Sequence, residues 1–220
     1  MYPVNLEITE KLCVVVGGGR VAERKVSGLL SEGAQVRIIS PRLTEQLVQL
    51  ADDKKIQWIE RGYRTGDLAG AFLVFAATDS AGVQEKVLLD ANAAGQLVNV
   101  IDQPAHCTFQ VPASVRRGEL TLTVSTHGKS PAVAAMIRQQ MEDQYGVEYA
   151  VLLNMMSSLR EYLFMHKESC EERKILFKNI LDEDIVLWIK TGQWDRLRHH
   201  LHSVLGSETD FDFNFPGDNA

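Results

Sequence analysis

The stretch Leu12-Cys-Val-Val-Val-Gly-Gly-Gly-Arg-Val-Ala-Glu-Arg-Lys25 decides the fold of this chain. An apolar, β-branched run is followed by three glycines and then by apolar residues at helical spacing, which stop at Gly33. This order predicts a strand, a tight turn and a helix. Gly17, Gly19 and Ala22 fit the G-x-G-x-x-A fingerprint of dinucleotide-binding domains, in which the helix N-terminus holds a pyrophosphate. We therefore expect a nucleotide site here, although a glycine-rich turn can also serve tight packing alone.

Composition limits the class of protein. The chain has 220 residues, of which 45% are hydrophobic and 24% charged, and its net charge is −6. These values are typical of a soluble globular protein. The acidic balance argues against a nucleic-acid partner, because phosphate binding needs a clustered basic surface. Without a membrane-spanning apolar run or a signal-peptide pattern, we expect a cytoplasmic protein with no membrane partner, and its three distant cysteines predict reduced thiols.

Strands and helices alternate through the first half of the chain. Further strands are predicted at 35–39, 56–59, 72–76 and 97–101, with helices at 44–51 and 80–94 between them. This alternation predicts an α/β domain with a Rossmann-type, doubly wound parallel sheet over residues 1–112. Ligands of such sheets bind beyond the carboxyl ends of the strands. Those ends carry the glycine turn, Ser40-Pro41-Arg42, Ala77-Thr78-Asp79 and Asp102.

The pattern changes after Pro112. Residues 115–119 are predicted to form a polar turn, 120–125 a strand with alternating Leu and Thr, and 131–145 a helix capped by Ser130. So few elements cannot bury a core, and residues 113–147 are predicted to form a small α+β region that completes itself against the first domain or a second subunit. Residues 148–220 show only helical periodicity, which predicts a helical domain with a loose acidic tail from Ser207.

Asp102 is the strongest candidate for chemistry. It directly follows an apolar strand, at the end of the sheet where a cofactor would lie. We expect a half-buried carboxylate whose pKa is raised, so that it can act as a base. An aspartate that only forms a turn before Gln103-Pro104 is an equally good interpretation on these residues alone. Asn99, within the strand, is interpreted as a satisfied polar residue.

Other polar groups leave alternatives open. His106-Cys107 and His199-His200-x-His202 invite a metal site, but their spacing favours surface histidines. A basic segment contains Arg116, Arg117, Lys129 and Arg138. This segment is either a solvated face or a surface that binds an acidic substrate. At the end of the second strand an acidic residue commonly holds the ribose, and Arg42 in that region would instead favour NADP.

Four motifs, in order, carry a resemblance to a known family: 15–25 with the glycine turn, Ala76-Ala-Thr-Asp79, Val98-Asn-Val-Ile-Asp102 and Gly128-Lys-Ser-Pro131. Over about residues 1–165 the chain resembles the precorrin-2 dehydrogenase / sirohydrochlorin ferrochelatase family of sirohaem synthesis. The resemblance implies an NAD-dependent homodimer with a Rossmann domain, a swapped central dimerisation region (113–147) and a C-terminal helical domain (148–220).

The resemblance also implies a reaction and its residues. Precorrin-2, a macrocycle rich in carboxylates, loses hydride to NAD⁺ and protons to give sirohydrochlorin, and some family members then insert Fe²⁺. Asp102 takes the place of the catalytic residue. Cofactor contacts are implied at Gly17, Gly18, Gly19, Arg20, Val21, Ser40, Pro41, Arg42 and Thr78. Candidate substrate-binding residues are Arg116, Arg117, His127, Lys129 and Ser130, and no resident metal is expected.

The chain departs from the family pattern in two places. A second glycine is usual where His127 stands, and Asp-Asp or Asp-Asn-Pro is usual where this chain has Asp102-Gln103-Pro104. Both departures leave chelatase activity open. No methyltransferase domain is seen, so precorrin-2 is expected to come from another enzyme. A nucleotide-sensing binding module without catalysis is the alternative, and Asp102 together with the basic segment favours the enzyme.

Overall fold

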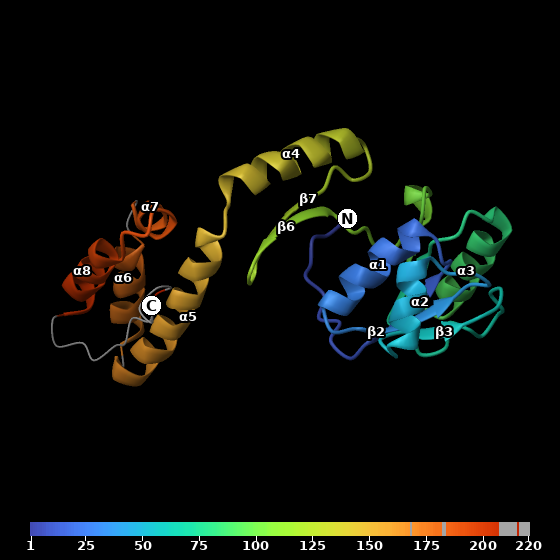
Figure 1. Cartoon of the computed structure of the whole chain (residues 1–220), viewed down its shortest axis with the longest axis horizontal. Helices are drawn as coiled ribbons and strands as arrows, with labels where there is room; N and C mark the ends of the chain where they lie inside the picture. Colours follow the sequence, from blue (N-terminus) through green and yellow to red (C-terminus); the bar gives the residue numbers. More distant parts are fainter. Residues whose placement is uncertain (168, 182–183, 207–214, 216–220) are drawn as a thin grey trace. The chain divides into compact units, whose positions relative to one another are not determined.

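The computed structural model describes residues 1–167, 169–181, 184–206 and 215 (Figure 1). The chain divides into two compact units, Met1–Val111 and Pro112–Ala220. The first predicted boundary, after residue 112, lies one residue from this division. The further division at residue 147 remains a prediction.

The first unit is built on a five-stranded sheet in the order β3-β2-β1-β4-β5, with every neighbouring pair parallel. Its strands are β1 Leu12–Val16, β2 Gln35–Ile39, β3 Gln57–Ile59, β4 Leu73–Ala76 and β5 Leu97–Val100. Its α-helices are α1 Arg20–Ser31, α2 Glu45–Asp52 and α3 Ala81–Ala93. The predicted doubly wound Rossmann-type sheet is confirmed. The strand order reverses between β1 and β4, which is where such sheets bind ligands.

Both faces of this sheet are covered, which explains its apolar strands. Cys13 and Val15 of β1 pack with residues of α1 and α2, whereas Val14 and Val16 pack with residues of α3 (Figure 1). Burial raises the pKa of the Cys13 thiol to about 11, so this cysteine is an inert part of the core. Its thiol is free, as predicted.

The second unit begins with an antiparallel hairpin of β6 Ala113–Arg117 and β7 Leu120–Val124, followed by α4 Pro131–Gln144. The predicted polar turn over residues 115–119 is wrong, because only Gly118 and Glu119 form the turn. Val115 is buried, and Gly118 adopts a φ of 58° that suits a two-residue hairpin turn. The cap of α4 is confirmed, since the N–H of Val133 donates to Ser130 Oγ at 3.2 Å.

Four further helices complete the described part of the second unit: α5 Glu148–His166, α6 Cys170–Ile180, α7 Ile185–Lys190 and α8 Trp194–Leu205. Their apolar faces form one core around Leu159, Leu163 and Leu197, and the predicted helical character is confirmed. The predicted loose tail lies outside the described residues except at Phe215. That side chain is buried and stacks on Trp194, with ring centroids 5.4 Å apart. Within the described ranges, no helix combines the length and the apolar character needed to cross a membrane.

Candidate active site

The glycine turn after β1 combines two roles. Gly17 has a φ of 123°, and a side chain there would overlap the backbone carbonyl of Ala77 after β4. A side chain on Gly18 would overlap the carbonyl of Arg42 after β2. Gly19 has no neighbouring atom within 4 Å of the place where a Cβ would stand. The first two glycines therefore allow the turn to pack between two strand ends, whereas Gly19 leaves open space in front of the backbone.

This open space lies at the N-terminus of α1. Gly19 is the N-cap residue and supplies no side-chain cap for the helix. The first N–H groups of a helix have no partner within the helix and attract anions. Ala22 is fully buried, so the small residue of the fingerprint brings the helix close to the sheet. A pyrophosphate fits these features, with Arg20 and Val21 in the first turn beside it.

The loop after β2 is held by its own hydrogen bonds. Ser40 is buried, and its Oγ donates to the carbonyl of Arg42 at 2.6 Å. The indole N–H of Trp58 donates to the carbonyl of Ser40 at 2.9 Å. Pro41 and Arg42 are exposed. The Ser40 hydroxyl thus shapes the loop, and Pro41 and Arg42 remain exposed on it.

Asp102 lies at the tip of a tight turn beyond β5. The N–H of Gln103 donates to the carbonyl of Val100 at 3.3 Å, and Asp102 has a φ of 61° as the third residue of this turn. A left-handed conformation is costly for a residue other than glycine and is often found at functional sites. The expectation of a half-buried carboxylate is wrong, because the tip position exposes Asp102.

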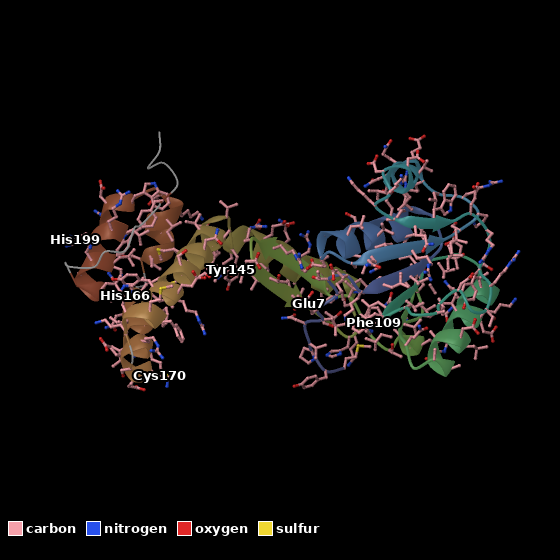
Figure 2. All side chains as sticks on the ribbon, turned by 90° about the horizontal axis from the view of Figure 1, so that it is seen from below. Glu7, Phe109, Tyr145, His166, Cys170 and His199 are labelled. Carbon is pink, nitrogen blue, oxygen red and sulfur yellow. The ribbon has the colours of Figure 1, made fainter. Side chains whose placement is uncertain are left out.

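The segment after this turn folds back onto β5. The Cys107 thiol accepts from the N–H of Val100 at 3.2 Å and lies 3.3 Å from the carbonyl of Gln103. Asn99 Nδ2 donates to the carbonyl of Phe109 at 3.1 Å, so its predicted role as a satisfied polar residue is confirmed. The Phe109 ring packs edge-on against a core phenylalanine of β4 (Figure 2). The base of the Asp102 turn is therefore firmly supported.

Lys25 of α1 lies near Phe75 of β4, and its partial burial was not predicted from the sequence. Its Nζ lies 5.7 Å from the centroid of the Phe75 ring, and burial lowers its pKa from the ordinary value. The sequence pattern of an amphipathic helix predicts an exposed lysine at this position. The only signal for a different environment was that Lys25 belongs to the motif 15–25.

The candidate substrate residues fall into two groups in the second unit. Arg117 Nη2 donates to the carbonyl of Glu142 at 3.1 Å, near the C-terminus of α4. The loop with His127, Lys129 and Ser130 leads into the N-terminus of the same helix. Glu142 lies eleven residues after Pro131, about 16 Å along the helix. The basic segment is thus not one cluster within this chain.

The loop before α4 is a tight turn. The N–H of Lys129 donates to the carbonyl of Thr126 at 3.0 Å, and His127 and Gly128 have φ values of 53° and 76°. His127 and Lys129 are exposed. Glycine adopts such a positive φ without strain, which gives a physical reason for the glycine that the family resemblance implies where this chain has His127.

The histidine pairs take different environments. His199 is exposed on α8 (Figure 2), whereas His200 Nε2 lies 3.0 Å from the carbonyl of Ile180. His106 Nδ1 lies 2.8 Å from Gln103 Oε1. Among the described residues, His, Cys, Asp and Glu form no group of three or more that could hold a metal ion.

Comparisons with known proteins agree with this geometry. The family described as "Putative NAD(P)-binding" matches residues 4–113, which is half of the chain. The chain belongs to this NAD(P)-binding family. Residues 117–144 of this NAD(P)-binding chain also match the family described as "Sirohaem biosynthesis protein central".

The relatives of this NAD(P)-binding chain include two curated sirohaem synthases. Those of Methylobacillus flagellatus and Nitrosococcus oceani are each 34% identical over 203 residues, which cover 92% of this chain but 44% and 43% of theirs. The chain thus spans less than half the length of these relatives. A solved structure named "SirC, precorrin-2 dehydrogenase" is 25% identical with a TM-score of 0.80, covering 93% of this chain and 99% of that one. The resemblance inferred from the four motifs is confirmed.

Proposed function

We propose that this chain oxidises precorrin-2 to sirohydrochlorin with NAD⁺ in sirohaem biosynthesis. One observation carries the proposal: the likeness to the structure named precorrin-2 dehydrogenase extends over 93% of this chain and 99% of the other. A shared Rossmann sheet alone would not indicate a substrate, since that fold serves many reactions. Here the likeness continues through the second unit, which a generic nucleotide-binding domain lacks.

The cofactor would be held by the strand ends of the first unit. Gly17, Gly18 and Gly19 with Arg20 and Val21 would hold the pyrophosphate, because the turn leaves open space at the N-terminus of α1. Exposed Pro41 and Arg42, shaped by Ser40, and the loop at Thr78 would contact the rest of the nucleotide. Bound NAD⁺ supplies a hydride acceptor. We propose NAD⁺ on the strength of the family, with NADP⁺ as the competing cofactor because of Arg42.

Asp102 would accept the proton. As the macrocycle loses hydride to the cofactor, a proton leaves with it, and the exposed carboxylate beyond β5 would receive this proton. The products are sirohydrochlorin, NADH and a protonated Asp102, which then releases its proton to solvent. Binding of a large macrocycle would cover the carboxylate and exclude water from it.

The second unit would supply substrate contacts and a dimer interface. We propose that Arg116, His127, Lys129 and Ser130 bind substrate carboxylates, whereas Arg117 mainly ties β6 to α4. Helix α4 has no buried residue, and Val133 and Met136 are 42% and 55% exposed. An apolar surface of this kind supports a homodimer in which this region is completed by a second copy. The free cysteines are consistent with the cytoplasm as its compartment.

The test is an anaerobic assay. Purified protein is mixed with precorrin-2 and NAD⁺, and separately NADP⁺, while the macrocycle spectrum is followed before and after Fe²⁺ is added. We expect oxidation with NAD⁺. An iron-dependent change above the uncatalysed rate would add chelatase activity. Absence of oxidation with either cofactor, from protein shown to bind nucleotide, would contradict the proposal and favour the nucleotide-sensing module.

A further inference from the structure

A buried glutamine connects the proposed cofactor loop with the turn that carries Asp102. Gln84 lies on α3, and only 8% of it is exposed. Its Nε2 donates to the carbonyl of Thr78 at 2.7 Å. Its Oε1 accepts from Gln103 Nε2, also at 2.7 Å, across 19 positions of sequence. Two strand ends, those of β4 and β5, are thus joined through one side chain.

The direction of these hydrogen bonds follows from chemistry. The Thr78 carbonyl can only accept, so Gln84 must turn its amide nitrogen toward it and its oxygen toward Gln103. Gln103 then presents its nitrogen to Gln84 and its oxygen to His106 Nδ1, 2.8 Å away. His106 must therefore carry its proton on Nδ1. Only one orientation of the two side-chain amides gives each of these polar atoms a partner, so the geometry of the series is fixed.

The Asp102 turn needs such support. Its closing backbone hydrogen bond is 3.3 Å long, and the φ of 61° at Asp102 is unfavourable for a side-chain-bearing residue. The Gln103 to Gln84 bond is shorter, at 2.7 Å, and its partner is more than nine-tenths buried. Hydrogen bonds with buried partners hold geometry better than those exposed to water. The side chain of Gln103 is thus a main constraint on the residue before it.

We propose that Gln84 and Gln103 are positioning residues, which couple cofactor binding at the Thr78 loop to the placement of Asp102. The inference rests on the proposed function, since it assumes that Thr78 contacts the cofactor and that Asp102 takes the proton. A nucleotide that orders the Thr78 loop fixes the carbonyl to which Gln84 is bonded. The constraint passes to Gln103 and so to the Asp102 turn.

The first experiment compares Gln84→Met, Gln103→Met and the double variant in precorrin-2 oxidation. Methionine keeps the length of the side chain and removes its amide. We expect kcat to fall about tenfold in each single variant, because both variants lose the hydrogen bond between Gln84 and Gln103; a tenfold fall corresponds to about 1.4 kcal/mol in the barrier. The double variant should lose no more than either single one, and KM for precorrin-2 should be unchanged. A multiplicative loss in the double variant, or kcat kept within about twofold in the single ones, would overturn the coupling.

Gln96→Met is the matched control. Gln96 Nε2 donates to the carbonyls of Leu68 and Ala71, at 2.7 and 3.0 Å, so this variant also loses amide hydrogen bonds in the same unit. Gln96 directly precedes β5, at the opposite end of the strand from Asp102. We expect lower stability with normal kcat. An equal fall in kcat for Gln96→Met would mean that the effect of Gln84→Met is general destabilisation, which would overturn the proposal.

A second readout does not depend on turnover. The ring signals of His106, assigned with His106→Asn, should shift when NAD⁺ is added to the wild-type protein and should stay still in Gln84→Met that still binds NAD⁺. If this response is seen but no precorrin-2 is oxidised, the proposed function fails and the coupling stands. If precorrin-2 is oxidised but His106 responds equally in both proteins, the coupling fails and the proposed function stands.

Discussion

The backbone carbonyl of Ala77 occupies the space that a side chain on Gly17 would need. Gly17 also has a φ of 123°, which an L side chain rarely adopts. Gly17→Ala should therefore lower the free energy of unfolding by about 2 kcal/mol or more. Gly19→Ala is the matched control, because the backbone of Gly19 is extended and no neighbouring atom lies within 4 Å of the place where the new Cβ would stand. It should leave stability within about 0.5 kcal/mol and weaken NAD⁺ binding at least about tenfold. Chemical unfolding and calorimetric titration would check both, and normal nucleotide affinity in Gly19→Ala would contradict the pyrophosphate site.

Asp102→Asn separates chemistry from folding. Asparagine tolerates a left-handed φ, so the turn should keep its shape while the proton acceptor is lost. We expect NAD⁺ affinity to be unchanged and kcat to fall by about 10²- to 10⁴-fold. Calorimetric titration would measure the NAD⁺ affinity, and steady-state assays with precorrin-2 would measure kcat. Turnover equal to that of the wild-type protein would remove Asp102 from the mechanism.

His127→Gly tests the substrate role of the loop before α4. The φ of 53° at His127 means that glycine relieves strain, while its greater freedom in the unfolded chain acts in the opposite direction. We expect the net change in stability to stay below about 1 kcal/mol. KM for precorrin-2 should rise, because a contact with a substrate carboxylate is lost. A variant with unchanged KM and kcat would exclude His127 from the binding site.

Arg116→Ala and Arg117→Ala should differ in kind. Arg117 donates to the carbonyls of Arg116 and Glu142, at 2.8 and 3.1 Å, so removing it should lower stability by about 1 kcal/mol or more. Arg116 is exposed and is a proposed substrate contact, so its loss should raise KM for precorrin-2. Thermal unfolding and steady-state kinetics of both variants would check this. An unchanged KM for precorrin-2 in Arg116→Ala would exclude Arg116 from the binding site, and unchanged stability in Arg117→Ala would contradict its role in tying β6 to α4.

Acid should destabilise the first unit through Asp67. Its carboxylate accepts two hydrogen bonds from the Arg61 guanidinium, both at 2.7 Å, and these bonds lower its pKa from the ordinary value. A group with a lowered folded-state pKa stabilises the fold above its unfolded-state value of about 3.9, and this contribution is lost as pH falls through the folded-state pKa. Urea unfolding of the wild-type protein and Asp67→Asn at pH 7 and pH 3 would show it. The difference between the two proteins should be smaller at pH 3 than at pH 7, and an equal difference at both would refute the assignment.

The sequence predicted those features that local patterns report directly. The central strands β1 and β4 are buried on both faces and wholly apolar, and three successive glycines after an apolar strand are typical of a dinucleotide-binding turn. The strand β6 escaped prediction because Arg116 and Arg117 read as solvated residues, while its pairing depends on a partner across Gly118. The exposure of Asp102 depends on how the turn projects from the sheet, which sequence does not report.

The connection between Gln84 and Gln103 escaped for a related reason. A glutamine among polar residues of a helix reads as solvated, and hydrogen bonds between side chains 19 positions apart leave no periodic signal. By contrast, the sequence did predict that the strand ends with the candidate cofactor residues lie together, because parallel strands bring their carboxyl ends to one edge of the sheet. What was missed is therefore a contact between two strand ends, which no pattern along the chain reports.

The left-handed backbone at Asp102 also bears on how such chains evolve. Aspartate and asparagine adopt this conformation with similar ease, so selection for a stable fold does not distinguish between them. One replacement at this position would cost the chain its proposed reaction and leave the fold of its first unit intact. On this fold a single substitution would therefore separate an enzyme from a ligand-binding regulator, and selection for turnover would be what preserves the aspartate.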